Sequence, residues 1–364
     1  MITESAQEGL ALQNENGSFP KGMNGPWKDE DTYVRTTAHW TLLQYKAFEI
    51  TKDRKHETSA KKACDYLLEK GNRPYGYSFY CREGRKKDRC NGLIGQAWAL
   101  EALLQMSIKT GEEKYLDCVR ELLICSSYDK KNHIWNNVEI DGKLFSCGTL
   151  NQQIWFNVMV LIGSKVLKDK NLEDKAVDFF KHIFNIIEFL DDGLIKHEIG
   201  INNMSVKRLI KNILKLSVNT DMEKIKIRSF GYISFILFGF AIAYNNCGQY
   251  TFWENNELKS LIRNAYFYVK NRKPYGCGSD GSDYIWGYNP VGIEMAYTIQ
   301  ALNDYLQLNE SEEEIKYWLN LQIKNHYDFN TKYLSKNTVD PAILSARLYE
   351  AAYLDNYVLE IVSF

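Results

Sequence analysis

The sequence has almost no net charge, no very long apolar run and no secretory signal, and each absence excludes a class of protein. Its 45 basic and 46 acidic residues nearly cancel, without a basic stripe of the kind that follows nucleic acid. The most apolar run, 231–244, is shorter than the roughly 20 residues that cross a bilayer. The amino terminus lacks the charged and apolar regions of a signal peptide. We therefore expect neither a nucleic-acid partner nor a membrane span.

The sequence also lacks paired cysteines. Its eight cysteines include no CxxC motif, and 364 residues are far more than a disulfide-stapled mini-domain contains. We expect free thiols and a cytoplasmic location. Cys81, Cys90, Cys147 and Cys277 fall in predicted loops, but their spacing does not call for a metal. The prediction is no metal and no cofactor, and the oligomeric state stays open.

Aromatic residues, in contrast, are abundant. The chain has 24 Tyr, 17 Phe and 8 Trp, which together make up 13% of its residues. Core filling in a large fold accounts for most of them. Many others stand beside Gly and Asn in predicted loops, where flat apolar faces with polar edges suit stacking on a sugar ring.

Two kinds of helix alternate along the chain. Amphipathic helices with a charged face are surface helices, and they are predicted at 3–13, 57–70, 112–126, 173–190, 254–270 and 310–323. Helices that are apolar nearly all round must be covered on every side. These inner helices are predicted to begin near residues 34, 92, 149, 231, 291 and 339.

Six outer and six inner helices predict an all-α fold, an (α/α)6 toroid that occupies 1–364 as one domain. Closure into a ring removes the ends that an open solenoid would need to cap; an ordinary helical array is the alternative. The long interval before the fourth inner helix predicts a basic insertion at about 201–228. This insertion is either a lid over the ring or a solvated excursion.

Because all inner helices run the same way round such a ring, the six loops before them gather at one end. Polar residues near the helix starts should then line one cavity, since a buried polar group needs a partner. The candidate substrate-binding residues are Arg35, Arg89, Asn91, Gln96, Trp98, Asn151, Gln152, Trp155, His197, Tyr232, Asp283, Trp286 and Tyr288. Arg35 and Arg89 are a candidate clamp for a carboxylate, because a guanidinium is a planar fork that matches a planar anion.

Glu294 and Asp88 are the candidates for proton transfer, with Asp31 and His39 in reserve. Glu294 lies about one turn inside an apolar helix, so its carboxyl is either protonated, as a general acid requires, or paired with a cation such as Arg35 or Arg89. In the second case Glu294 is a structural brace.

Several of these signals have a structural alternative. Gln96 sits within an apolar helix, where its amide can bond a neighbouring carbonyl instead of a ligand. The acidic run 29–31 also fits the amino-terminal cap of a helix.

Three motifs carry a resemblance. Cys90-Asn-Gly-Leu-Ile-Gly-Gln-Ala-Trp98, Val34-Arg-Thr-Thr-Ala-His-Trp40 and Asn151-Gln-Gln-Ile-Trp155 resemble the AglQ-type proteins, encoded in archaeal glycosylation clusters and bacterial polysaccharide clusters. Shorter motifs extend this likeness over most of the chain: Gly17-Ser-Phe-Pro20, Asp192-Gly-Leu-Ile-Lys-His197 and Gly231-Tyr-Ile-Ser-Phe235.

The core Gly95-Gln-Ala-Trp98 is similar, more distantly, to a motif of the unsaturated glucuronyl hydrolases, which share the (α/α)6 fold. Those hydrolases carry an Arg before this core, where this chain has Ile94. The resemblance therefore carries over Gln96 and Trp98 as substrate contacts but no catalytic acid. It implies a glycan-processing role, with a hexuronic acid as one expected substrate.

The leading hypothesis is an enzyme that acts on an acidic, uronic-acid-containing saccharide, either a glycoside hydrolase or an epimerase or isomerase on the same scaffold. The second is a non-catalytic glycan-binding protein of a glycosylation locus. The third is a terpene-cyclase-like protein, faintly suggested by Asp29-Glu-Asp31-Thr32. A polar mouth with carboxylates about 5–10 Å apart would favour hydrolysis, whereas a greasy mouth would favour the third hypothesis.

Overall fold

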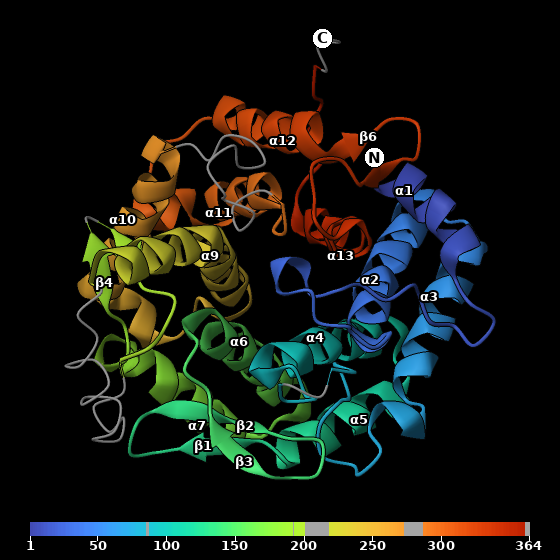
Figure 1. Ribbon diagram of the computed structural model, residues 1–364, viewed down its shortest axis with the longest axis horizontal. Helices are drawn as coiled ribbons and strands as arrows, with labels where there is room; N and C mark the ends of the chain where they lie inside the picture. Colours follow the sequence, from blue (N-terminus) through green and yellow to red (C-terminus); the bar gives the residue numbers. More distant parts are fainter. Residues whose placement is uncertain (85–86, 192, 201–217, 273–286, 361–364) are drawn as a thin grey trace.

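The computed structural model describes residues 1–84, 87–191, 193–200, 218–272 and 287–360, and it shows a ring of helices in two layers (Figure 1). The inner layer comprises α2 (Val34–Thr51), α4 (Gly92–Thr110), α6 (Leu150–Leu167), α9 (Val218–Cys247), α11 (Val291–Leu306) and α13 (Pro341–Ala346) with the 3-10 segment η6 (Arg347–Tyr353). The outer layer comprises α1 (Ile2–Gly9), α3 (Arg54–Leu67), α5 (Glu113–Ile124), α7 (Lys170–Lys181), α10 (Asn256–Arg272) and α12 (Glu312–His326). The predicted (α/α)6 toroid is confirmed.

The inner helices contact one another in order, and the ring closes where α13 and η6 pack on α2. The closure also joins the two ends of the described chain, because the Ser5 hydroxyl donates to the Lys332 carbonyl and α1 contacts η6. Figure 1 shows α1 beside β6 (Tyr327–Asp328) at this junction. No end of the helix array is left to cap.

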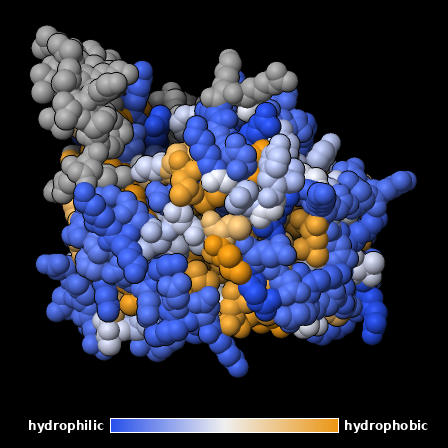
Figure 2. All heavy atoms as spheres, turned by 90° about the horizontal axis from the view of Figure 1, so that it is seen from below, coloured by the Kyte–Doolittle hydropathy of each residue, from blue (hydrophilic) through white to orange (hydrophobic). Residues whose placement is uncertain are grey.

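Burial follows the two helix patterns. In α4 every residue from Gly92 to Leu104 is buried, whereas α7 buries only four of its residues: Leu172, Ala176, Phe179 and Phe180. Figure 2 shows one side of the ring, where hydrophilic side chains cover most of the surface and apolar ones show in small groups. The amphipathic helices are the outer layer, as predicted.

Most observed boundaries lie within four residues of the predicted ones, and three differences matter for the architecture. α9 begins at Val218 rather than near residue 231, so part of the predicted insertion continues the inner helix, and residues 201–217 lie outside the described part. α7 ends at Lys181, before the strand β4 (Phe189–Asp191) that pairs with β5 (Leu194–Ile195). The sixth inner helix is α-helical only over Pro341–Ala346 and continues as 3-10 helix.

Small antiparallel sheets decorate the loops. The largest has the order β1 (Ser127–Asp129), β2 (Ile134–Val138), β3 (Leu144–Ser146), and a two-stranded sheet joins β6 to β7 (Tyr333–Leu334). None of these strands was predicted, because each spans at most five residues and carries too short a pattern to read.

One described helix, in the stretch Met222–Cys247, is long and apolar enough to cross a membrane. However, 72% of its most apolar window is buried within the protein, where α9 packs against α6 and α11. A helix in the core of a protein has the same apolar composition as a membrane-spanning helix. Because α9 is covered by its neighbours, it needs no polar face.

Candidate functional site

A cavity of about 220 Å³ opens where the loops before the inner helices converge. All six hairpins contribute side chains to its wall, as the ring topology requires. The lining residues are Asn24, Trp27, Arg82, Lys87, Asn91, Ile94, Trp98, Thr149, Asn151, Gln152, His197, Arg228, Tyr232, Phe235, Tyr288, Asn289 and Arg347. Seven of the candidate binding residues are in this set: Asn91, Trp98, Asn151, Gln152, His197, Tyr232 and Tyr288.

The described wall is cationic. Arg82, Lys87, Arg228 and Arg347 line it, and no described Asp or Glu does. Each of these cations is paired with a carboxylate that does not line the cavity: Asp88, Asp29, Glu198 and Glu294 respectively. Two of these cations flank one aromatic ring, since Lys87 Nζ lies 5.1 Å and the Arg228 guanidinium 5.0 Å from the Trp27 ring centroid. The wall is thus suited to an anionic ligand with flat apolar faces. It is not predominantly apolar, and the cavity is open to solvent.

The turn into α4 presents Asn91 to the cavity. Asn91 and Gly92 both have left-handed backbone, with φ of 55° and 58°. A side chain at Gly92 would collide with the Gln152 amide oxygen, which accepts a hydrogen bond from the Leu93 N–H at 3.2 Å. The Asn-Gly pair therefore lets two neighbouring inner helices approach closely at the mouth.

Arg35 is buried behind the wall between two aromatic rings. Its guanidinium lies 4.0 Å from the Trp98 centroid and 5.2 Å from that of Tyr288, and it donates to Asn24 Oδ1 at 3.0 Å. Tyr288 donates to the same oxygen at 3.0 Å. Arg35 thus holds the rings and amide that face the ligand, rather than reaching the cavity itself.

His39 extends this stack on the other side of Trp98. Its ring stacks on Tyr349 at 4.7 Å and meets Trp98 edge-on at 5.3 Å. Burial lowers the pKa of His39 well below its usual value, and Arg35 and Arg347 lower it further. His39 is therefore a neutral imidazole.

His197 is a second neutral imidazole, and it lines the cavity. Its ring stacks on Tyr232 with centroids 4.3 Å apart. Burial, with a smaller effect from Arg228, lowers the pKa of His197 to about 3. The two rings form a face-to-face stack in the wall.

Buried polar atoms without a hydrogen-bond partner concentrate around this cavity. Asn91 Nδ2, Trp98 Nε1, Asn151 Oδ1 and His197 Nδ1 belong to lining residues, and both ring nitrogens of His39 lie behind Trp98. Native proteins leave few such atoms unpaired, so their concentration at one place indicates a polar ligand or bound water there.

Glu294 is fully buried and paired, but with neither of the predicted arginines. Its Oε1 accepts from Arg347 Nη2 at 2.7 Å and its Oε2 from the Ser234 hydroxyl at 2.6 Å. Arg347 Nε also donates to Glu350 at 2.6 Å, and its Nη1 donates to Asn289. The expected pairing with Arg35 or Arg89 was wrong, and Glu294 braces a cavity-lining arginine.

This brace holds one cation between two carboxylates. Burial raises the pKa of both Glu294 and Glu350, although Arg347 opposes the shift. Glu350 Oε2 has no hydrogen-bond partner. Since two buried negative charges around one cation are unfavourable, the state with one protonated carboxyl is preferred.

Asp88 is a cap rather than a free acid. Its Oδ1 accepts from the Gly92 N–H at 2.7 Å, at the start of α4, and its Oδ2 accepts from Arg82 at 3.0 Å. Asp88 is not among the cavity-lining residues. The structure thus gives both leading proton-transfer candidates, Asp88 and Glu294, engaged partners.

Asp31 is the carboxyl in the state a general acid needs. It is fully buried, neither oxygen accepts a hydrogen bond from the described residues, and Arg35 Nη1 lies 3.6 Å away. Burial raises the pKa of Asp31 to about 7, although Arg35 opposes the shift. Asp31 also pairs through its backbone with Arg82, which lines the cavity.

Three candidate binding residues lie away from the cavity wall. The Gln96 amide is fully used by backbone groups, so its expected contact with substrate is wrong. Trp155 packs on Phe235 and Phe238, and Arg89 is exposed beside Tyr80. Asp283 and Trp286 fall outside the described residues.

The sequence reasoning missed the cations Arg82, Lys87, Arg228 and Arg347. Arg347 carried a usable signal, because an arginine and Glu350 interrupt an otherwise apolar inner helix, as Glu294 does. The three others stand in loops or in the predicted insertion, where a charged residue is unremarkable.

Comparison with known proteins supports the resemblance seen in the motifs. A scan of family models finds no match. A curated protein of Haloferax volcanii, archaeal glycosylation protein Q, is 29% identical over 371 residues, which cover 98% of this chain and 97% of that protein. This chain resembles archaeal glycosylation protein Q. The likeness spans nearly the whole chain.

Solved structures share the fold at low sequence identity. A cellobiose 2-epimerase from Bacillus thermoamylovorans B4167 has a TM-score of 0.63 and 10% identity, covering 97% of this chain and 98% of that one. An inactive variant of the α-1,6-mannanase of Salegentibacter sp. HEL1_6, in complex with α-1,6-mannotetrose, has a TM-score of 0.61 and 12% identity, with 97% of both chains covered. An unsaturated glucuronyl hydrolase specific for heparin has a TM-score of 0.57 and 12% identity, covering 97% and 95%.

Proposed function

We propose that this protein is a carbohydrate-active enzyme of glycan or polysaccharide metabolism, and that it acts on a uronic-acid-containing saccharide in the cavity at the mouth of the ring. The observation that carries the proposal is the composition of the wall, in which four cations, several amides and aromatic rings stand together. The likeness to archaeal glycosylation protein Q and the shared fold of sugar-processing enzymes support a saccharide as the substrate.

Each part of the wall has a role in this proposal. Arg82, Lys87 and Arg228 bind the carboxylate of the sugar, because charge-assisted hydrogen bonds are the strongest available in a half-enclosed site. Trp98 and the His197–Tyr232 surface stack on the sugar ring. The amides of Asn91, Asn151 and Gln152 bind its hydroxyl groups.

We propose glycoside hydrolysis as the reaction, with the Asp31 carboxyl as the source of the proton. Asp31 is fully buried beside the Arg82 backbone and does not itself line the cavity, so its proton has to reach the leaving oxygen through a water molecule. A carboxyl with its pKa raised to about 7 is protonated in much of the population at neutral pH, as a general acid requires. In a hydrolase a second carboxylate is needed. No described Asp or Glu lines the wall.

Epimerisation or isomerisation is the second candidate reaction. The observation that favours it is the pair of buried neutral imidazoles, His197 in the cavity wall and His39 in contact with Trp98 of that wall. A neutral imidazole accepts a proton, although one whose pKa is about 3 is a weak base. A polar, cationic wall does not suit a hydrocarbon, so the terpene-cyclase-like hypothesis is not pursued.

The test incubates the purified protein with oligouronides, and with neutral oligosaccharides of equal length, in H₂O and in D₂O. Mass spectrometry distinguishes hydrolysis, which adds one water and splits the chain, from epimerisation, which exchanges a carbon-bound hydrogen for deuterium. Saccharide binding without either change identifies a non-catalytic glycan-binding protein. Absence of binding to every acidic saccharide contradicts the proposal.

Arg228→Gln tests the cationic wall directly. Arg228 is about one third exposed and has a 3.5 Å ion pair with Glu198, so its replacement should leave the fold intact. Affinity for an oligouronide should fall by about 10-fold or more, the effect of one charge-assisted contact, while affinity for a neutral saccharide stays unchanged. Arg120→Gln, on the exposed face of outer helix α5, is the matched control.

A further inference from the structure

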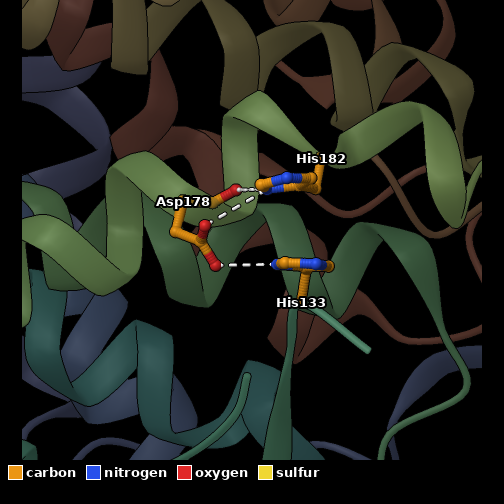
Figure 3. Close-up of side chains that lie close together, drawn as sticks. All are labelled: His133, Asp178 and His182. Carbon is orange, nitrogen blue, oxygen red and sulfur yellow. Dashed lines mark hydrogen bonds and ion pairs between the residues drawn. The ribbon is translucent and has the colours of Figure 1, made fainter. Parts of the chain in front are cut away.

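His133, Asp178 and His182 form a cluster on the outside of the ring (Figure 3). Asp178 lies in the last turn of α7, and His182, four residues later, caps the carboxyl end of that helix, so the two side chains are neighbours. His133 comes from the turn between β1 and β2. None of the three lines the central cavity, and the reaction proposed above does not use them.

The two imidazoles face one carboxylate. His133 Nδ1 lies 2.8 Å from Asp178 Oδ2, and His182 Nδ1 lies 3.2 Å from Asp178 Oδ1. The rings are stacked with centroids 3.7 Å apart and an interplanar angle of 13°. Figure 3 shows that His133 contacts the Asp178 carboxylate, whereas His182 contacts both that carboxylate and, at 2.9 Å, the Asp178 backbone oxygen.

These separations are close to those around a tetrahedral metal ion. Zinc binds nitrogen and oxygen at about 2.0–2.2 Å, which places neighbouring ligand atoms roughly 3.3 Å apart. The His182–Asp178 separation of 3.2 Å is near that value, whereas the His133–Asp178 separation of 2.8 Å is that of a hydrogen bond and would have to lengthen. One ligand atom from each residue lies within 4.8 Å of the others, so small rotations of the side chains would bring all three around one ion.

A further contact orients the carboxylate. The Tyr128 hydroxyl, from β1, donates to Asp178 Oδ2 at 2.7 Å. Metal-binding carboxylates commonly have such a supporting donor. The three side chains are 24–38% exposed, so an ion can reach them.

We propose that His133, Asp178 and His182 bind a divalent transition-metal ion, zinc in the first place. Two imidazoles and one carboxylate are a donor set that suits zinc, copper or nickel, whereas magnesium and calcium prefer oxygen ligands alone. The fourth position is left for water. Each neutral imidazole would bind the ion through Nδ1 and carry its single proton on Nε2.

Such an ion would fasten the three-stranded sheet to the outer helix layer. His133 directly precedes β2, whose Trp135 backbone is bonded by Gln153 of inner helix α6. The next residues towards the amino end of α6, Asn151 and Gln152, line the cavity. A metal bound at the outer layer would therefore stabilise the third hairpin, whose inner helix α6 contributes Asn151 and Gln152 to the cavity wall.

The experiment is isothermal titration calorimetry of the full chain, stripped with EDTA and dialysed, with ZnCl₂ at pH 7.5. One equivalent should bind, and zinc should raise the Tm. His133→Gln, His182→Gln and Asp178→Asn should each weaken binding by about 10-fold or more, and Tyr128→Phe by about 10-fold, as loss of a supporting donor does. Asp174→Asn, one turn before Asp178 on α7 and exposed, is the matched control and should bind as the wild type does.

Binding should also weaken at pH 5, because a protonated imidazole cannot bind a metal. Zinc binding that survives in all three ligand variants, or no stoichiometric binding by wild-type protein with native circular dichroism, would overturn the proposal. In that case the histidines serve only as donors to Asp178. If a ligand variant fails to fold, zinc binding is measured in Tyr128→Phe instead. In addition, Cu²⁺ is bound to the wild-type protein and examined by electron paramagnetic resonance. A Cu²⁺ spectrum without nitrogen coordination would overturn the proposal.

Discussion

Gln96 and Gln153 make the same hydrogen bonds on neighbouring inner helices. Each side-chain oxygen accepts from the backbone N–H of an aromatic residue, Phe79 or Trp135, and each amide donates to the carbonyl of that residue. Each amide also donates to a cysteine carbonyl six residues earlier, that of Cys90 or Cys147. In two successive hairpins of the ring, a glutamine therefore fixes the position of the loop that precedes its own helix.

This equivalence predicts that Gln96→Leu and Gln153→Leu destabilise the protein by similar amounts. Each change leaves three buried backbone groups without a partner, and one such group is worth roughly 1–3 kcal/mol. Urea unfolding measures the loss. The affinity of folded Gln96→Leu protein for a saccharide should hardly change. A loss of affinity at unchanged stability would show instead that Gln96 contacts the ligand.

Trp98→Ala should weaken saccharide binding by roughly 1–3 kcal/mol, beyond the stability lost on truncating a buried ring. Trp98 lines the cavity and supports both Arg35 and His39. Calorimetric titration of the folded protein separates the two effects. Trp40→Ala is the control, because Trp40 is equally buried but packs on Phe19 outside the cavity wall. Similar affinities in the two variants would assign Trp98 to the core alone.

Glu294→Gln should lower stability and leave much of the turnover. Breaking a buried ion pair costs roughly 3–5 kcal/mol, because the remaining charge loses its partner; here Arg347 keeps Glu350, so the loss should fall at the low end. Thermal unfolding and initial rates are the measurements. A fall in turnover of about 100-fold with an unchanged Tm would instead make Glu294 the acid.

Asp31→Asn should reduce turnover by about 100-fold or more if Asp31 is the general acid. In the wild type, turnover should fall as pH rises through about 7, where Asp31 loses its proton. A rate unaffected by this replacement would remove Asp31 from the mechanism.

The same group has a predictable effect on stability. The folded-state pKa of Asp31, about 7, lies above the usual 3.8, so its stabilising contribution is complete below about pH 4 and is lost as pH rises to about 7. The difference in Tm between wild type and Asp31→Asn should therefore shift in favour of the variant across that range. A difference that is constant with pH would contradict the raised pKa.

The ring was predictable because the signal for it is repeated. Helices such as Gly92–Thr110, with almost no polar face, alternate with amphipathic ones, and only a two-layer arrangement covers the first kind. The boundaries at Val218 and Ala346 were less accessible to pattern, since helix ends depend on tertiary packing.

The site was predictable in its location and in its residue types, but not in its charge pairing. Topology alone brings Asn91, Asn151 and Tyr288 to one end of the ring. Which carboxyl is free depends on neighbours distant in the sequence. Arg347 engages Glu294 and Arg82 engages Asp88, whereas Asp31 is left without a hydrogen bond. A single sequence does not show such partners.

Ring closure has a consequence for how the protein is made. The carboxylate of Asp340 accepts from the backbone N–H of Gly25, 315 positions away, and that contact shapes the loop that carries Asn24 and Trp27. During synthesis the first hairpin leaves the ribosome long before its last neighbour exists. Until the sixth hairpin is synthesised, the earlier hairpins have an uncovered apolar edge. Chaperones can bind this edge, and it can cause aggregation. The cavity itself is complete only when the sixth hairpin docks, so nascent chains should be unable to bind saccharide until that hairpin has been synthesised.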